Sequence, residues 1–137
     1  MIKYFFSLLT MLATTSLAAP LLTTTQSWDA GSIAYPVGQA EIASIVLHLE
    51  EGKAAPFHCH PVPTMGYVLQ GTVLVETKSG KATTIAKGDA LVEVMRTVHR
   101  GIAVDGPAEL VVFYAGAEGI PHTVLPSDDP GGVHCDD

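Results

Sequence analysis

Residues 52–71 read GKAAPFHCHPVPTMGYVLQG and place two histidines, His58 and His60, in a segment that predicts a strand, a turn and a second strand. Side chains alternate along a strand, so His58 and His60 project from one face while Cys59 points to the other. Neutral imidazole is the commonest metal ligand in proteins and suits zinc, copper, iron and nickel. The stretch therefore indicates one half of a metal site.

The chain on both sides of this stretch is rich in strand signals. Seven or eight short strands are predicted, separated by turns that contain Gly, Asp, Ser or Pro. Two of them fall in residues 66–77, on either side of a hinge at Gly71, and a short one follows the next turn and ends at Ile85. The others fall in residues 42–49, 90–94, 98–104 and 109–115. The strand at residues 42–49 is expected to be mostly buried. No segment after the first nineteen residues shows a helical period, so the predicted class is all-β, a sandwich or a small barrel.

The length of 137 residues suits one domain. Residues 1–19 start with a basic residue, continue as a short apolar run and end in small residues, which predicts a cleavable signal peptide. An uncleaved anchor is the alternative. We expect residues 20–39 to form a leader strand or loop, 40–116 the barrel and 117–137 a tail. The expected location is secreted or periplasmic, with no membrane contact after cleavage.

The charge of the mature chain limits its partners. Loss of Lys3 with the signal peptide leaves six of the 7 basic residues against 14 acidic ones, a formal charge of −8. This argues against nucleic acid and anionic membrane surfaces, which require basic patches. Export permits a bridge between Cys59 and Cys135, the two cysteines of the chain, although their spacing does not show whether they meet.

A metal site needs at least a third ligand, and His99 in the predicted strand 98–104 is the candidate. Strands separated by two hairpins can face each other across a rolled antiparallel barrel, which would bring His99 to His58 and His60. Three neutral imidazoles leave coordination positions open for water, oxygen or substrate, as in catalytic rather than structural sites. His48 is interpreted as an ordinary sheet histidine.

These residues and their spacing resemble the cupin family. Its first motif, G-x5-H-x-H-x3,4-E-x6-G, is matched in spacing by Gly52, His58, His60, Thr64 and Gly71. Its second motif, G-x5-P-x-G-x2-H-x3-N, is matched at Gly88 and His99, while Val94, Arg96 and Ala103 replace its other residues. The resemblance implies a double-stranded β-helix, or jelly-roll barrel. It also implies one divalent metal ion (Fe, Zn, Mn, Ni or Cu) held by His58, His60 and His99 in the barrel mouth.

The chain departs from the family at Thr64, where cupins usually carry a metal-binding glutamate. Loss of that carboxylate would leave a bound ion with its full charge and make it a stronger Lewis acid. Cupins with three histidines and no acid include thiol dioxygenases and a β-diketone-cleaving dioxygenase, so the resemblance implies a dioxygenase-like enzyme. Thr64 and Tyr67 are candidates to assist the site without binding metal. Either Glu76 or Glu93 could replace the missing acid or orient a ligand histidine, and the sequence does not choose between them.

Two other functions remain open. One is a non-catalytic cupin that binds a sugar or another small molecule directly through its histidines, which the threonine at position 64 favours slightly. The other is a structural, dimer-forming domain, since small cupins often associate through their sheets. A small-molecule ligand or substrate and a homodimer are the expected partners. The fold resemblance does not decide among these functions.

Overall fold

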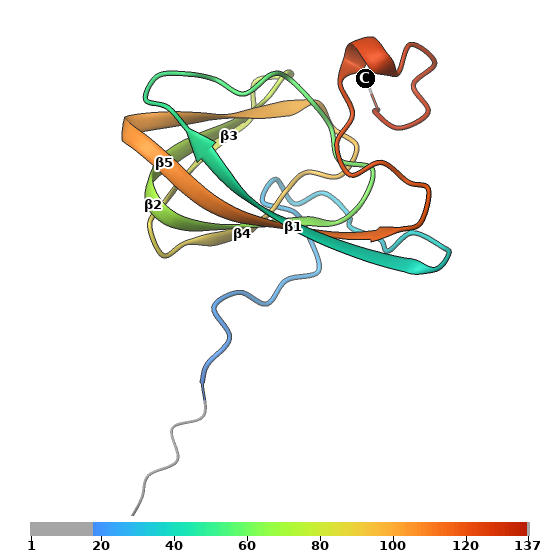
Figure 1. The fold of residues 1–137 in the computed structure, drawn as a ribbon, viewed down its shortest axis with the longest axis horizontal. Helices are drawn as coiled ribbons and strands as arrows, with labels where there is room; N and C mark the ends of the chain where they lie inside the picture. The colour runs from blue at the N-terminus through green and yellow to red at the C-terminus, as the bar shows by residue number, and fades with distance from the viewer. Residues whose placement is uncertain (1–17, 137) are drawn as a thin grey trace, which may run out of the picture.

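The computed structural model describes residues 18–136, which form an antiparallel β-barrel followed by a folded tail (Figure 1). The elements are β1 (Ala40–Leu49), β2 (Thr64–Thr77), β3 (Ala82–Ala86), β4 (Ala90–Val92), β5 (His99–Ala117) and a short 3₁₀ helix, η1 (Pro126–Asp128). The strand order is β1-β5-β2-β3, and β4 pairs with the beginning of β2. The predicted all-β class is confirmed.

The predicted signal peptide, residues 1–19, lies outside the described residues except for its last two. Within residues 18–136 the chain has no helix of the length and apolarity needed to cross a bilayer. The leader that follows is irregular. Its Trp28 packs against the core, and the backbone N–H of Trp28 donates to the carbonyl of Val92 at 2.9 Å.

Two strands are longer than predicted. The strands expected on either side of Asp105-Gly106-Pro107 form the single strand β5, because the positive φ angles of Asp105 (59°) and Gly106 (113°) bend the strand without ending it. In the same way β2 passes Gly71 as one bent strand, and its register with β5 shifts on both sides of Gln70. The separate short strands predicted here were wrong.

The prediction that residues 42–49 are mostly buried was also wrong. They belong to β1, an edge strand that pairs with β5, and Ile42, Ile45 and Val46 are 69%, 46% and 51% exposed. Strand composition shows that a segment pairs, but it does not show how many neighbours the strand has. The structure describes one chain, so the homodimer stays a prediction.

The core lies between the inward faces of β2 and β5. Its buried residues include Val68, Val73, Val75, Leu110, Val112 and Tyr114. Both strands curve around this core, so their inward faces line the same interior (Figure 1). The row of apolar side chains continues toward residues 58–60, and the interior of the barrel therefore leads to the histidines.

Gly71 occupies a position that a larger residue cannot adopt without strain. Its φ is +79°, and a Cβ added there would lie 2.4 Å from the carbonyl oxygen of Pro107. We expect Gly71→Ala to lower the free energy of unfolding by roughly 3 kcal/mol, from the left-handed backbone and the clash together. Gly80→Ala is the matched control: its φ is +95°, but the added Cβ would meet nothing within 4 Å. Equal losses in urea denaturation of the two variants would contradict the role of the close approach.

Candidate metal centre

Backbone pairing brings His58 and His99 together. The N–H of His58 donates to the carbonyl of His99 at 2.9 Å, and the reverse bond measures 2.8 Å. Residues paired directly across antiparallel segments project their side chains to the same side. His60 lies on the same face as His58 because it follows two residues later. The ligand nitrogens of the three histidines all lie within 4.8 Å of one another.

Each of these imidazoles is oriented by a backbone carbonyl. The Nδ1 atoms of His58 and His99 lie 2.7 and 2.8 Å from the carbonyl oxygens of Pro56 and Thr97. The Nδ1 of His60 lies 2.8 Å from the carbonyl of His122. A carbonyl oxygen only accepts, so a neutral ring must carry its proton on Nδ1 and leave the Nε2 lone pair free. This is the arrangement typical of metal-binding histidines.

The histidine cluster is largely removed from water. His60 and His99 are 4% and 1% exposed, and His58 is half-buried. Burial lowers the pKa of all three imidazoles, and the neighbouring histidines lower that of His60 further, to about 3. The three rings are therefore neutral at neutral pH, which is the form that binds metal.

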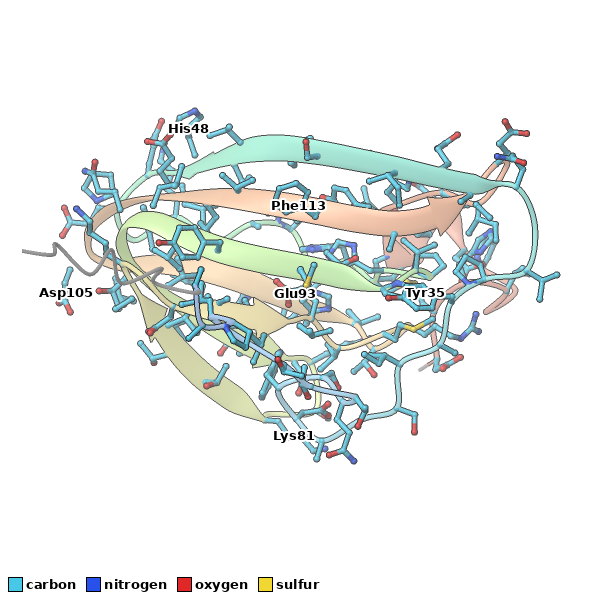
Figure 2. The ribbon with its side chains drawn as sticks, turned by 90° about the horizontal axis from the view of Figure 1, so that it is seen from below. Tyr35, His48, Lys81, Glu93, Asp105 and Phe113 are labelled. Atoms are coloured by element: carbon cyan, nitrogen blue, oxygen red, sulfur yellow. A yellow bond between two sulfur atoms is a disulfide. The ribbon has the colours of Figure 1, made fainter. Side chains whose placement is uncertain are left out.

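The cluster opens into a cavity of about 300 Å³ inside the barrel. Most of its lining is aliphatic, from β1, β2 and β5, and the chain contributes few polar groups besides the histidines, Glu93, Tyr114 and Thr123. Glu93 lies in the barrel interior in Figure 2, whereas His48 and Lys81 lie at the periphery. The cavity has the size and apolar character of a small-molecule site.

The C-terminal tail completes one wall of the site. Cys59 faces away from the histidines, as predicted, and forms a disulfide with Cys135 across 76 residues of sequence. Two backbone hydrogen bonds of 2.9 and 3.0 Å join Cys59 to Val124. These contacts place Thr123 and Leu125 on the cavity and the carbonyl of His122 on His60. The tail thus packs against the barrel beside the histidines.

The two residues predicted to assist the site lie on opposite faces of β2. Thr64 is 1% exposed, and its hydroxyl donates to the carbonyl of Val62 at 3.0 Å. Tyr67 is partly exposed, three positions away and therefore on the other face, and it is not among the residues that line the cavity. The tyrosine at the cavity is Tyr114, whose ring lies 5.6 Å from that of His60.

Tyr114 was missed as a functional residue, although strand alternation offered a signal. It has the same parity as Leu110 and Val112 in the most apolar strand of the chain, and all three are buried. Its ring stacks on that of His122 with centroids 5.1 Å apart. Burial raises the pKa of the Tyr114 phenol, so the hydroxyl stays protonated and can donate a hydrogen bond.

The structure separates the two candidate carboxylates. Glu76 lies outside the cavity, where its Oε1 accepts from the guanidinium of Arg100 at 2.7 and 2.6 Å. Glu93 lines the cavity, and its Oε2 lies 3.4 Å from the Nε2 of His99. Burial raises the pKa of Glu93 to about 7.

A divalent cation fits the residues present. Among the described residues, the Nε2 of His99 and the Oε2 of Glu93 are buried atoms without a hydrogen-bond partner. With the His99 proton on Nδ1 and the Glu93 carboxyl ionised, both atoms present lone pairs, and a cation near them would satisfy both. Three neutral imidazoles form a donor set that suits Zn, Fe, Cu or Ni.

Solved structures resemble the barrel at low sequence identity. The DMSP lyase DddQ from Ruegeria pomeroyi matches with a TM-score of 0.55 and 22% identity, over 64% of this chain and 44% of that one. An oxalate oxidase in complex with glycolate gives 0.52 and 22%, over 61% and 45%. A cupin-like protein from Thermotoga maritima gives 0.51 and 18%, over 65% of each chain. The present chain spans less than half the length of the lyase, and these likenesses show the fold alone.

The family assignment comes from the sequence of the barrel itself. No curated protein sequence matches the chain significantly. The family model described as the cupin domain matches residues 45–114, just over half of the chain, from β1 to Tyr114 in β5. The match contains all three histidines of the cluster. The chain therefore belongs to the cupin family and has the jelly-roll barrel that the family resemblance implied.

Proposed function

We propose that this protein is an exported cupin that holds one divalent metal ion through His58, His60 and His99 and acts on a small substrate as a metal-dependent, dioxygenase-like enzyme. One observation carries the proposal: three buried imidazoles converge with each Nδ1 against a backbone carbonyl. That arrangement directs the Nε2 lone pairs to a common space. Histidines that only filled the core would leave these buried lone pairs without a partner.

The chain's own residues define what the site could do. A bound divalent ion would supply Lewis acidity and, in the case of iron, redox chemistry with oxygen. The aliphatic cavity wall would exclude water and favour a substrate with an apolar part. Tyr114 offers a phenolic donor at the cavity wall, where it would orient a polar group of the substrate.

The disulfide between Cys59 and Cys135 supports the exported location. Disulfides persist in the periplasm and outside the cell but are rare in the reducing cytosol. The negative charge of the chain is compatible with either compartment. Detection of the processed chain in a periplasmic or medium fraction, and its absence from the cytosol, would test this part of the proposal.

Metal and oxygen measurements test the function directly. We expect protein purified anaerobically to contain about one Fe, Zn, Mn, Ni or Cu ion per chain by elemental analysis. We expect the iron-loaded protein to consume oxygen with at least one member of a panel of thiols, β-diketones and phenols. Metal-free protein that does not bind these ions on titration would overturn the metal site. Full iron loading without oxygen uptake across the panel would overturn the dioxygenase-like activity.

A non-catalytic, ligand-binding cupin is the second candidate. The apolar cavity of about 300 Å³ favours it, because such a cavity can hold a small molecule without any chemistry. The fold does not decide, since the structures that share it include proteins named as lyases and as an oxalate oxidase. A small molecule that co-purifies with metal-free protein and contacts the histidines would favour this alternative.

A further inference from the structure

The neighbours of Thr64 in the barrel show which residue could replace the metal-binding glutamate that cupins usually carry at this position. Thr64 begins β2 and has a neighbour on each side: Tyr114 of β5 stands opposite it, and the N–H of Glu93 donates to its carbonyl at 2.9 Å. The pairing of Met65 with Val92 places Glu93 directly opposite Thr64 on the β4 side. Opposed residues in an antiparallel pair share a face, with Cβ atoms about 5 Å apart.

The side chain of Glu93 therefore points to the interior that Thr64 faces. It lines the cavity, as Tyr114 does, while the short side chain of Thr64 does not reach the cavity lining. The carboxylate lies in the middle of the barrel in Figure 2, away from the labelled rim residues His48 and Asp105. The glutamate side chain is 14% exposed and its Oε2 atom is inaccessible to water.

The contact between Glu93 and His99 is unfavourable when the Glu93 carboxyl is ionised, because neither of the two facing atoms then carries a hydrogen. The Oε2 of Glu93 lies 3.4 Å from the Nε2 of His99, and neither atom has a hydrogen-bond partner. The Nδ1 of His99 faces the Thr97 carbonyl at 2.8 Å, so the neutral ring has a lone pair on Nε2. Nitrogen and oxygen ligands bound tetrahedrally at ~2.0–2.2 Å from one ion are about 3.4 Å apart. The observed separation from His99 suits two ligands of one cation, while among the described residues the group of ligand atoms that lie within 4.8 Å of one another contains the three histidines alone.

We propose that Glu93 is the acidic ligand of this centre and replaces, from the neighbouring strand, the glutamate that the family's first motif carries at the position of Thr64. This inference rests on the proposed metal site. It changes the expected electrostatics: the donor set becomes three imidazoles and one carboxylate, and a bound divalent ion loses half of its formal charge to Glu93. Such a set favours divalent ions that accept both nitrogen and oxygen ligands, such as Zn²⁺, Fe²⁺, Mn²⁺ and Co²⁺.

Metal titration of Glu93 variants tests the inference. Metal-free protein would be titrated with Zn²⁺ in competition with a chromophoric chelator, and with Co²⁺ while its visible absorption spectrum is recorded. We expect Glu93→Gln, which keeps the size but removes the charge, to weaken Zn²⁺ binding about 100-fold and to change the Co²⁺ spectrum. Glu93→Asp keeps the charge on a shorter side chain and is expected to weaken binding about 10-fold.

Two controls separate the possible failures. Glu76→Gln removes a carboxylate that Arg100 holds outside the cavity, and we expect it to leave the Zn²⁺ affinity and Co²⁺ spectrum unchanged. His99→Ala is expected to abolish tight binding. If His99→Ala abolishes binding but both Glu93 variants bind Zn²⁺ like the unaltered protein, the Glu93 inference fails and the metal site stands. If His99→Ala also binds normally, the proposed metal site itself fails. Thermal unfolding of each metal-free variant shows whether it is folded.

Discussion

Replacing His99 by alanine is expected to remove the divalent ion from the purified protein and to weaken its rebinding more than 100-fold. Loss of a residue that only supports a metal ligand typically costs 10–100-fold in affinity, so loss of a ligand should cost more. His99 is 1% exposed and pairs with His58 through two backbone hydrogen bonds. Because the backbone is fixed there, another side chain cannot easily move in to supply the lost ligand nitrogen. Elemental analysis and Zn²⁺ titration measure both effects, and His58→Ala should behave in the same way.

His48→Ala is the matched control for this experiment. His48 lies on the exposed face of the edge strand β1 and does not line the cavity, which its neighbours Leu47 and Leu49 do, and it is seen at the periphery in Figure 2. We expect its loss to change neither the metal content nor the affinity. Equal metal content in His48→Ala, His58→Ala and His99→Ala would show that the ion binds elsewhere. The small-molecule alternative would then gain weight, because the histidines would be free to contact a ligand directly.

The histidine cluster was within reach of the sequence because two local rules specify it. Alternation along the strand puts His58 and His60 on one face. The spacing of the second cupin motif identifies His99 as the third histidine of the site. The structure adds the cause of the meeting, the paired backbone bonds between His58 and His99. Those bonds depend on long-range register, which a single sequence does not reveal.

The choice between Glu76 and Glu93 was out of reach for a physical reason. Glu76 has the same parity in β2 as Thr64 and Val68, so simple alternation would point it inward. Two register shifts, on either side of Gln70, invert the alternation, and after them Val73 and Val75 face the core. Glu76 therefore points outward to Arg100. Glu93 directly follows β4, stands opposite Thr64 and faces the cavity. Bulges of this kind leave little trace in composition.

The role of the tail was equally hidden. Its prolines and glycines indicate only that residues 117–137 form no regular strand or helix. The structure shows what holds it: the disulfide, the backbone bonds between Cys59 and Val124, and the carboxylate of Asp129, which accepts the N–H groups of three residues near the C-terminus at 2.8–2.9 Å. The tail is thus part of the site, because it supplies the carbonyl that orients His60.

Removing the disulfide is expected to have the largest effect on stability. The bridge closes a loop with a sequence separation of 76, for which the chain-entropy relation predicts a stabilisation of about 4.5 kcal/mol. We expect the double variant Cys59→Ala/Cys135→Ala to lose about 3–4 kcal/mol in urea denaturation and to melt roughly 10 °C lower or more. Reduction of the unaltered protein should give a similar loss.

The same variant is expected to weaken metal binding about 10-fold, because the carbonyl that holds the Nδ1 of His60 belongs to the tethered tail. The effect should be smaller than that of His99→Ala, since all three imidazoles remain and the backbone hydrogen bonds between Cys59 and Val124 also hold the tail.

A reducing agent should change the stability and Zn²⁺ affinity of the unaltered protein and leave those of the double variant unchanged. Two free thiols in the oxidised, folded protein, or equal urea midpoints for both proteins, would contradict the bridge. Unchanged Zn²⁺ affinity together with lowered stability would show instead that the tail keeps its place on His60 without the disulfide.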